Sequence, residues 1–277
     1  MTILPSFQGR WGKTGKDKPR IRILEVRSRK CPEGGPIAWI LVERDEHYEW
    51  DRPNAELMRA TLQLSYEMIL PKYDGRWGMQ GSFDAGYRPV FNVVSLSSQD
   101  CSSGALFLDL SGLEGNRIGT YLMNEIVEWV KQWPDATVNS IHLRPGQSSG
   151  ENKERRNRFY EQFGLVFDYT DPATREEGCS RPMRAKDLVT VDTWKENIRE
   201  MSVLDYLAET IYQMQELSSD TRAQKEAIKS LVAERHAAER YPIWWACKTL
   251  WRKYFGLLVS VVLVAGLAAV AWLRFRV

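Results

Sequence analysis

The stretch ALFLDLSGLEGNRIGTYLMNEIVEWVKQW, residues 105–133, decides the fold. It begins with a run typical of a strand (105–110), passes through a loop that contains Gly115 and Gly119, and continues into an amphipathic helix predicted over 117–133. Such a loop exposes backbone N–H groups at the positive end of the helix dipole, where a pyrophosphate can bind. An ordinary strand–helix turn has the same pattern, so the loop alone leaves both interpretations open.

Hydrophobic periodicity places further elements around this stretch. The expected strands are residues 21–26, 36–42, 90–96, 138–143 and 165–169. The expected helices are 54–70, with Asn54 as N-cap, and 151–163. Residues 72–89 are rich in Gly and aromatic residues and are expected to form a long loop, of a length that is usually functional or disordered. The alternation of strands and helices predicts an α/β sheet with its site at strand ends.

A second informative stretch is NKERRNRFYEQFGL, which begins at Asn152. Together with the first loop it resembles the GNAT superfamily of acetyl-CoA-dependent N-acetyltransferases, in which a Q/R-x-x-G-x-G/A loop opens the central helix and a later helix ends in a Y-E-K-x-G-F run. In this sequence Glu114 stands where Gln or Arg is usual, and Arg117 replaces the middle glycine. The resemblance covers residues 20–190 and implies a GNAT-like mixed central sheet flanked by helices.

The resemblance implies direct transfer of an acetyl group from acetyl-CoA, as co-substrate, to an amine of a protein or a small molecule, with no metal. It also implies which residues contact the cofactor: Leu110, Glu114, Gly115, Asn116, Arg117, Ile118, Gly119, Thr120 and Asn152. By position in the family pattern, Tyr160 is the candidate acid for the departing thiolate, although a core aromatic would have the same pattern. Asp109, late in its predicted strand, is the candidate base, unless strand alternation turns it to solvent.

The departures from the family pattern define an alternative function. Arg117 brings a long side chain to a position where the backbone should approach phosphate closely, although its charge could also contact the phosphate. Glu114 adds a negative charge near the pyrophosphate. The alternative is therefore a catalytically inactive GNAT-like fold that serves as a membrane-anchored binding or scaffold protein.

Composition excludes several other classes of protein. The chain has 277 residues, 43% of them apolar and 27% charged, which is unlike disordered and polytopic membrane proteins. Its formal net charge of +2 argues against nucleic acid as a partner. The four cysteines and three histidines share no metal-ligand spacing, so we expect no metal site and a reducing compartment.

The C-terminal region is predicted to contact a bilayer. Residues 255–273 carry no charge, and a helix of that length measures about 28 Å, close to the thickness of a hydrocarbon core. The preceding segment, 242–254, mixes aromatic with basic residues and is expected to lie at the interface. More Lys and Arg precede the span than follow it. We therefore expect a single-pass, tail-anchored protein whose N-terminal domain is cytoplasmic, in a bacterial inner membrane or its equivalent.

Two further segments complete the predicted organisation. Residues 1–20 are expected to be a basic flexible arm, followed by the GNAT-like domain at 21–190. Residues 191–241 are expected to form a helical stalk, and an apolar stripe within 201–239 makes this segment a candidate for homo-oligomer formation. Polar residues interrupt the stripe, so we expect two helices, or one helix with a break. The interrupting residues are Ser218, Thr221 and Lys225.

Overall fold

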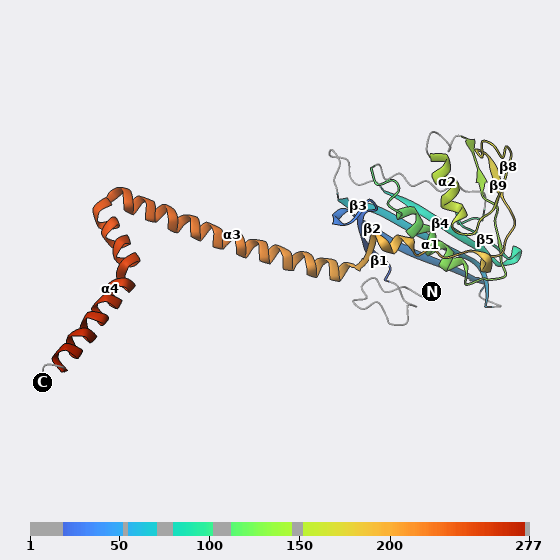
Figure 1. Ribbon diagram of the computed structural model, residues 1–277. Coiled ribbons are helices and arrows are strands. Elements are labelled where there is room, and N and C mark those ends of the chain that lie inside the picture. The colour runs from blue at the N-terminus through green and yellow to red at the C-terminus, as the bar shows by residue number, and fades with distance from the viewer. Residues whose placement is uncertain (1–18, 52–54, 71–79, 102–111, 146–151, 275–277) are drawn as a thin grey trace. The chain divides into compact units, whose positions relative to one another are not determined.

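The computed structural model describes residues 19–51, 55–70, 80–101, 112–145 and 152–274 (Figure 1). The chain divides into two compact units, Met1–Ala208 and Glu209–Val277. The first unit contains a seven-stranded sheet in the order β10-β1-β2-β3-β4-β5-β6 and a three-stranded sheet in the order β7-β9-β8. A mixed α/β fold, as predicted from the sequence, is therefore confirmed.

Long antiparallel strands build most of the large sheet. They are β1 (Ile21–Ser28), β2 (Cys31–Asp51), β3 (Glu56–Leu70) and β4 (Gln80–Arg88). The short strands β5 (Val93–Ser95) and β6 (Thr137–Val138) pair in parallel, while β10 (Ile198–Ser202) pairs antiparallel with β1 at the other edge. The single parallel pair makes the sheet mixed, and the chain between its two strands includes the central helix.

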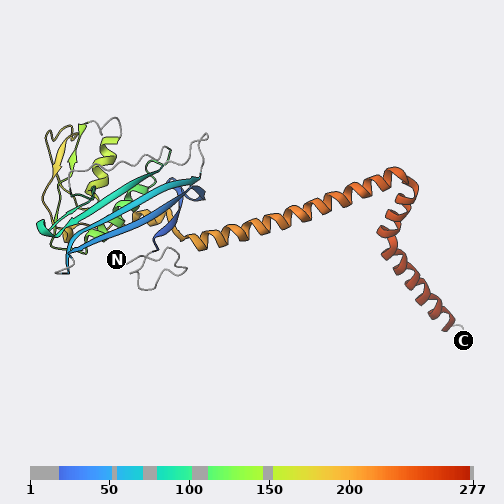
Figure 2. The same cartoon turned by 180° about the vertical axis from the view of Figure 1, so that it is seen from behind.

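That central helix, α1 (Ile118–Val130), lies against one face of the large sheet (Figure 1). Seen from behind, the long strands lie in front of it (Figure 2). Eleven of its thirteen residues are buried. Its apolar side chains meet alternate residues of the strands, among them Ile40 on β2 and Leu64 on β3, in one continuous core. This burial fixes the position of the loop that precedes α1.

The small sheet contains β7 (His142–Leu143), β9 (Gly178–Ser180) and β8 (Phe167–Tyr169), all antiparallel neighbours. Helix α2 (Asn152–Glu161) lies between β7 and β8 in the chain. The predicted strand 138–143 is split between the two sheets, because β6 belongs to one and β7 to the other. The chain thus leaves the large sheet directly after the parallel pair.

The predicted helix over 54–70 is wrong, because residues 56–70 form strand β3. Its apolar residues also fit a period of two: Ala60, Leu62 and Leu64 are fully buried in alternation. β3 has strand partners on both sides, β2 and β4, which satisfy its backbone N–H and C=O groups. Pairing between distant segments therefore decided the conformation of a sequence that also matched a helical pattern.

The predicted loop over 72–89 is wrong for its second half, since residues 80–88 form β4. Two glycines favoured the loop prediction, but both lie where the strand packs tightly. A Cβ at Gly81 would collide with the Tyr66 hydroxyl, and one at Gly86 would collide with the Gln99 carbonyl. Glycine here permits close approach of neighbouring groups.

The other predicted elements overlap elements of the structure, although β2 extends beyond the predicted strand at both ends. The strands predicted at 21–26 and 36–42 lie within β1 and β2, and those at 90–96 and 165–169 contain β5 and β8. The predicted helices 117–133 and 151–163 contain α1 and α2. The predicted strand 105–110 lies outside the described residues, as does Asn54.

The sheet continues beyond residue 190, where the GNAT-like domain was predicted to end. The short helix η4 (Thr193–Glu196) and strand β10 follow, so the first unit includes both. The stalk is then one unbroken helix, α3 (Val203–Arg240), and the predicted break is wrong. The Ser218 and Thr221 hydroxyls donate to the helix carbonyls of Gln215 and Leu217, so these residues fit within the helix.

Helix α4 (Pro242–Arg274) contains the predicted membrane span. Within the described part of the chain, no single helix has the length and hydropathy of a span. Two consecutive parts of α4, Pro242–Leu257 and Val259–Ala268, meet the requirement together, with a bend of 41° between them. The transmembrane assignment therefore stays a prediction.

Candidate functional site

The loop before α1 is a tight turn with open space above its glycine. The Asn116 N–H donates to the Leu113 carbonyl at 3.3 Å, and the buried Leu113 side chain anchors the turn in the core. Gly115 has φ of +79°, and no heavy atom outside its two chain neighbours lies within 4 Å of where its Cβ would be. The Glu114 side chain is exposed to solvent. A ligand could therefore approach the backbone at Gly115 without displacing a side chain.

Arg117, the residue that replaces the family's middle glycine, turns its guanidinium toward η4. Its Nη1 donates to the Thr193 carbonyl at 2.5 Å and forms an ion pair with Glu196 at 2.6 Å. Its backbone is left-handed, with φ of 65°, a conformation that glycine would adopt without strain. The Arg117 charge is thus already neutralised by a carboxylate of the same domain.

Asn116 attaches the loop to two neighbouring segments. Its Oδ1 accepts a hydrogen bond from the Arg29 N–H at 3.0 Å, in the turn between β1 and β2. Its carbonyl accepts one from Asn197 Nδ2 at 3.0 Å, at the start of β10. Asn197 Nδ2 also donates to the Arg27 carbonyl at 3.1 Å. The polar atoms of Asn116 therefore support the loop.

The two stretches that carry the family resemblance meet at the start of α1. Gln162, just after α2, donates from Nε2 to Thr120 Oγ1 at 3.2 Å. Thr120 and the preceding Ile118 are buried, and Gly119 between them is partly exposed. The contact joins residues 42 positions apart in the sequence. The end of α2 is therefore held against the N-terminus of α1.

Tyr160, the candidate acid, is 6% exposed and packs in an aromatic cluster. Its ring lies 5.0 Å from that of Phe159 and 5.8 Å from that of Phe167. Asn152 lies eight residues earlier, at the first turn of α2, which is about 12 Å along a helix. It is exposed and accepts a hydrogen bond from Arg155. Asn152 therefore lies at the opposite end of α2 from the α1 contact. Asp109 and Leu110 lie outside the described residues.

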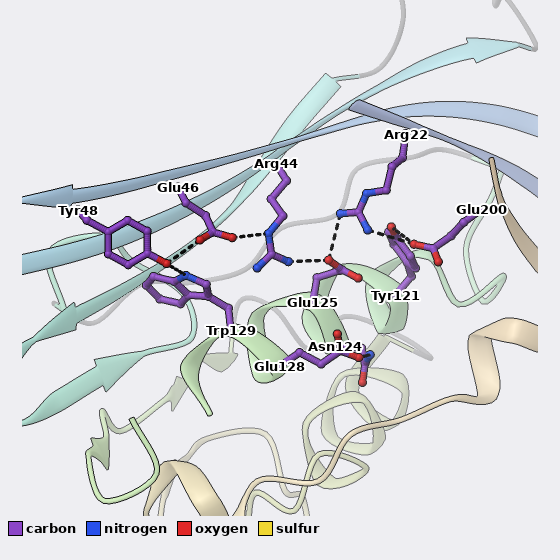
Figure 3. Close-up of polar contacts among 10 residues, drawn as sticks. All are labelled: Arg22, Arg44, Glu46, Tyr48, Tyr121, Asn124, Glu125, Glu128, Trp129 and Glu200. Atoms are coloured by element: carbon purple, nitrogen blue, oxygen red, sulfur yellow. Dashed lines mark hydrogen bonds and ion pairs between the residues drawn. The ribbon is translucent and has the colours of Figure 1, made fainter. Parts of the chain in front are cut away.

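A buried ionic network, which the sequence analysis missed, lies between α1 and the sheet (Figure 3). At its centre is Glu125 of α1, whose carboxylate is fully buried. Glu125 Oε2 accepts from Arg22 of β1 at 3.0 Å and from Arg44 of β2 at 2.7 Å. One carboxylate oxygen thus binds two guanidinium groups and ties the helix to two strands.

The network extends in both directions from this centre. On one side, Glu200 of β10 accepts from Arg22 at 3.1 Å and from the Tyr121 hydroxyl at 2.6 Å. On the other side, Glu46 of β2 accepts from Arg44 at 2.7 Å. Glu46 also accepts a hydrogen bond from the Tyr48 hydroxyl at 2.6 Å, and that hydroxyl accepts one from Trp129 Nε1 at 3.2 Å. The network therefore connects β10, β1, β2 and α1.

The electrostatics of the network hold its guanidinium and hydroxyl groups in one protonation state. Burial alone lowers the pKa of Arg22, but the Glu125 carboxylate and other nearby negative charges outweigh that effect and raise the pKa. Burial raises the pKa of Tyr121 well above its ordinary value. Burial, followed by the Glu46 carboxylate, raises the pKa of Tyr48 to about 12. The guanidinium groups therefore stay charged and the two hydroxyls stay protonated near neutral pH, so their contacts hold α1 against the sheet.

A signal for this network exists in the sequence. Arg44 and Glu46 lie on the same face of β2 as the buried Val42, and the residues between them point to the other face. Glu125 lies on the apolar face of α1, between Leu122 and Ile126. A charged residue at an apolar position implies a partner of opposite charge, but its identity depends on how the strands and the helix pack.

Two surface hollows are lined by residues outside this loop. One of about 440 Å³ lies over the small sheet, beside the cross-strand neighbours His142, Cys179 and Asp168. Another, of about 200 Å³, lies on the large sheet beside Asp45 and His47. The described residues contain no group of three or more His, Cys, Asp or Glu residues that could hold a metal ion.

Comparison with known proteins adds no further constraint. The chain matches no protein-family model, no curated protein and no solved structure. The interpretation of the site therefore depends on the loop, the α1–α2 contact and the sequence motifs that they contain.

Proposed function

We propose that the protein is a membrane-tethered N-acetyltransferase of the GNAT type, which moves an acetyl group from acetyl-CoA directly to an amine. The observation that carries the proposal is the hydrogen bond between Thr120 and Gln162, at 3.2 Å. It joins the two stretches of the family resemblance at the N-terminus of α1. Two independent motifs that meet at one helix end are more informative than either motif alone.

The geometry of the loop fits a pyrophosphate group. Backbone N–H groups at the first turn of α1, at Ile118, Gly119 and Thr120, would hold the phosphates. The open space above Gly115 would admit them, and the exposed side chain of Glu114 can turn its charge into solvent. The Arg117 side chain is drawn toward η4 by Glu196, which leaves the turn clear.

Bound acetyl-CoA would supply an acetyl thioester. The chain must then accept a proton from the attacking ammonium and deliver one to the departing sulfur. Tyr160 is the candidate donor, and Asp109 is the candidate acceptor. The buried network would contribute by holding α1, and thus the loop, rigidly against the sheet.

Calorimetric titration of the full chain in detergent with acetyl-CoA tests the cofactor proposal. We expect saturable binding, and an absence of binding at millimolar ligand would refute it. A Tyr160→Phe variant should retain binding and lose turnover. Tyr169→Phe, a change to a tyrosine on the small sheet, is the matched control and should retain both.

A second candidate function is an inactive GNAT-like scaffold. The observation that favours it is that polar groups of the loop already have partners within the domain: Arg117 binds Glu196, and Asn116 binds Arg29. In that case the loop would be a structural turn. A folded chain that fails to bind acetyl-CoA at millimolar concentration would support this second function.

The tether is also part of the proposal. It is supported by the uncharged run 255–273 and by the exposed aromatic residues Trp244 and Trp251 on α4. Such residues settle at a membrane interface. We expect the full chain to stay in the membrane fraction after alkaline carbonate extraction, and added protease should reach the N-terminal domain only from the cytoplasmic side. Release by carbonate would refute the span.

A further inference from the structure

The stalk helix α3 presents a long surface that none of the described residues covers. It contains 38 residues, and none of them is buried. Its large apolar side chains are instead exposed, for example Leu207 at 47% and Ile211 at 54%. Most helices in proteins are stabilised by packing of an apolar face, and isolated ones are marginally stable in water. We therefore expect another helix or surface to pack against the apolar side chains of α3.

The spacing of these side chains identifies the type of partner. The stripe alternates steps of three and four residues, and after a polar interval it resumes in the same heptad frame. The residues of this frame, which we term the seam, are Leu204, Leu207, Ile211, Met214, Ile228 and Val232. A period of 3.5 residues is typical of a helix that packs against another along its whole length.

We propose that the seam pairs with the seam of a second copy of this chain, in parallel and in register. In this arrangement each apolar block packs against the same block of the second copy. The polar interval at Ser218 and Thr221 faces the same interval of the second copy. A slip by one heptad would instead place Ile211 opposite Ser218 and Ile228 opposite Thr221. The self-complementary pattern thus favours an identical helix in the same register over an unrelated one.

The parallel direction follows from the membrane tether and so rests on that part of the proposed function. Two copies anchored through α4 have the C-terminal ends of their α3 helices at the same bilayer. Confinement to the membrane also raises the effective concentration of one copy near another. Lys225, in the polar interval, would face the same residue of the second copy, and this repulsion limits the strength of the pairing.

Cysteine cross-linking of the full chain in lipid vesicles tests both the partner and the register. The exposed Cys31 and Cys247 are first replaced by serine, and one cysteine is then introduced. Under mild oxidation, Ile211→Cys on the seam should give severalfold more disulfide-linked dimer than Glu209→Cys on the opposite face. Equal yields at the two positions would overturn the proposal, since disulfides form only between close Cα atoms.

Two further measurements test the register of the two helices and their self-association separately. Co-reconstituted Ile211→Cys and Val232→Cys chains should give only the two homotypic products, and a predominant mixed product would overturn the parallel register. Leu207→Lys should shift the chain toward monomer in mass photometry, whereas Tyr212→Lys, at an exposed position off the seam, should not. A monomeric parent chain would overturn the proposal, and carbonate extraction of the same sample tests the tether separately.

Discussion

Helices α1 and α3 have similar apolar spacing and opposite surroundings. In α1, eleven of thirteen residues are buried, whereas in the 38 residues of α3 none is. The sheet of the same chain covers the stripe of α1, whereas none of the described residues of the chain buries the stripe of α3. The comparison teaches that periodicity identifies the face that packs, while the covering partner depends on the rest of the fold.

Charged residues on the two helices show the same contrast. Glu125 lies on the buried face of α1 and binds Arg22 and Arg44 from two strands. Charged residues off the seam of α3 have a different environment, because Glu226 is exposed to water. A buried charge requires partners from other elements, whereas water solvates an exposed one. Substitutions matched between the helices can test this difference.

The largest effect is expected for Glu125→Gln. The change removes the buried carboxylate and leaves two guanidinium groups without it, so the free energy of unfolding of the first unit should fall by about 3–5 kcal/mol. Urea unfolding followed by tryptophan fluorescence measures this change. Glu226→Gln on α3 is the matched control and should change it by less than about 0.5 kcal/mol. Equal effects would mean that the network does not stabilise α1.

A slightly smaller loss is expected for Leu122→Ala in α1. Leu122 is fully buried, so the truncation leaves a cavity and should destabilise the first unit by about 2–5 kcal/mol. The same urea experiment applies. A loss below the lower end of this range would indicate that the core beneath α1 collapses around the truncated side chain.

A smaller and pH-dependent effect is expected for Tyr48→Phe. Because the folded state raises the pKa of Tyr48 to about 12, its contribution to stability is complete below its ordinary value of 10 and is lost as the pH rises through 12. The parent chain should therefore lose stability between these values, and Tyr48→Phe should lose less over the same interval. Tyr212→Phe, on the exposed surface of α3, should follow the parent curve.

The smallest effect on the first unit is expected for Leu207→Ala in α3. Since this side chain is 47% exposed, its truncation should change the unfolding free energy of that unit by less than about 0.5 kcal/mol. The same variant should weaken self-association, measured as the fraction of dimer in mass photometry. A large loss of stability in the first unit would show that α3 packs on its own chain.

The contrast between β3 and α1 explains which elements the sequence could predict. The α1 pattern fits only a helix, because its apolar residues recur at i+4 and a glycine-containing loop precedes it. The β3 pattern, which includes Leu62 and Met68, fits both periods, and pairing with β2 and β4 selected the strand. Local sequence cannot decide between two periods when the decisive hydrogen bonds come from distant strands.

Part of the candidate site could likewise be predicted from the sequence, and part could not. The loop, the start of α1 and Tyr160 could be identified from motifs, because each motif lies within a short stretch. The support from Asn197 and Glu196 could not, since both lie about 80 residues away from the loop residues that they bind. The network around Glu125 was missed for the same reason, because its partners come from β1, β2 and β10.

The sequence by itself determined the local features of this protein: the glycine-containing turn, the amphipathic helix after it, the heptad spacing of α3 and the uncharged run near the C-terminus. These depend on neighbouring residues, whose spacing sets the periodicity and the backbone freedom. Only the tertiary structure decided that residues 56–70 are a strand, that Arg117 turns to Glu196, and that Glu125 is buried. Each of these outcomes depends on hydrogen bonds or ion pairs between segments that only folding brings together.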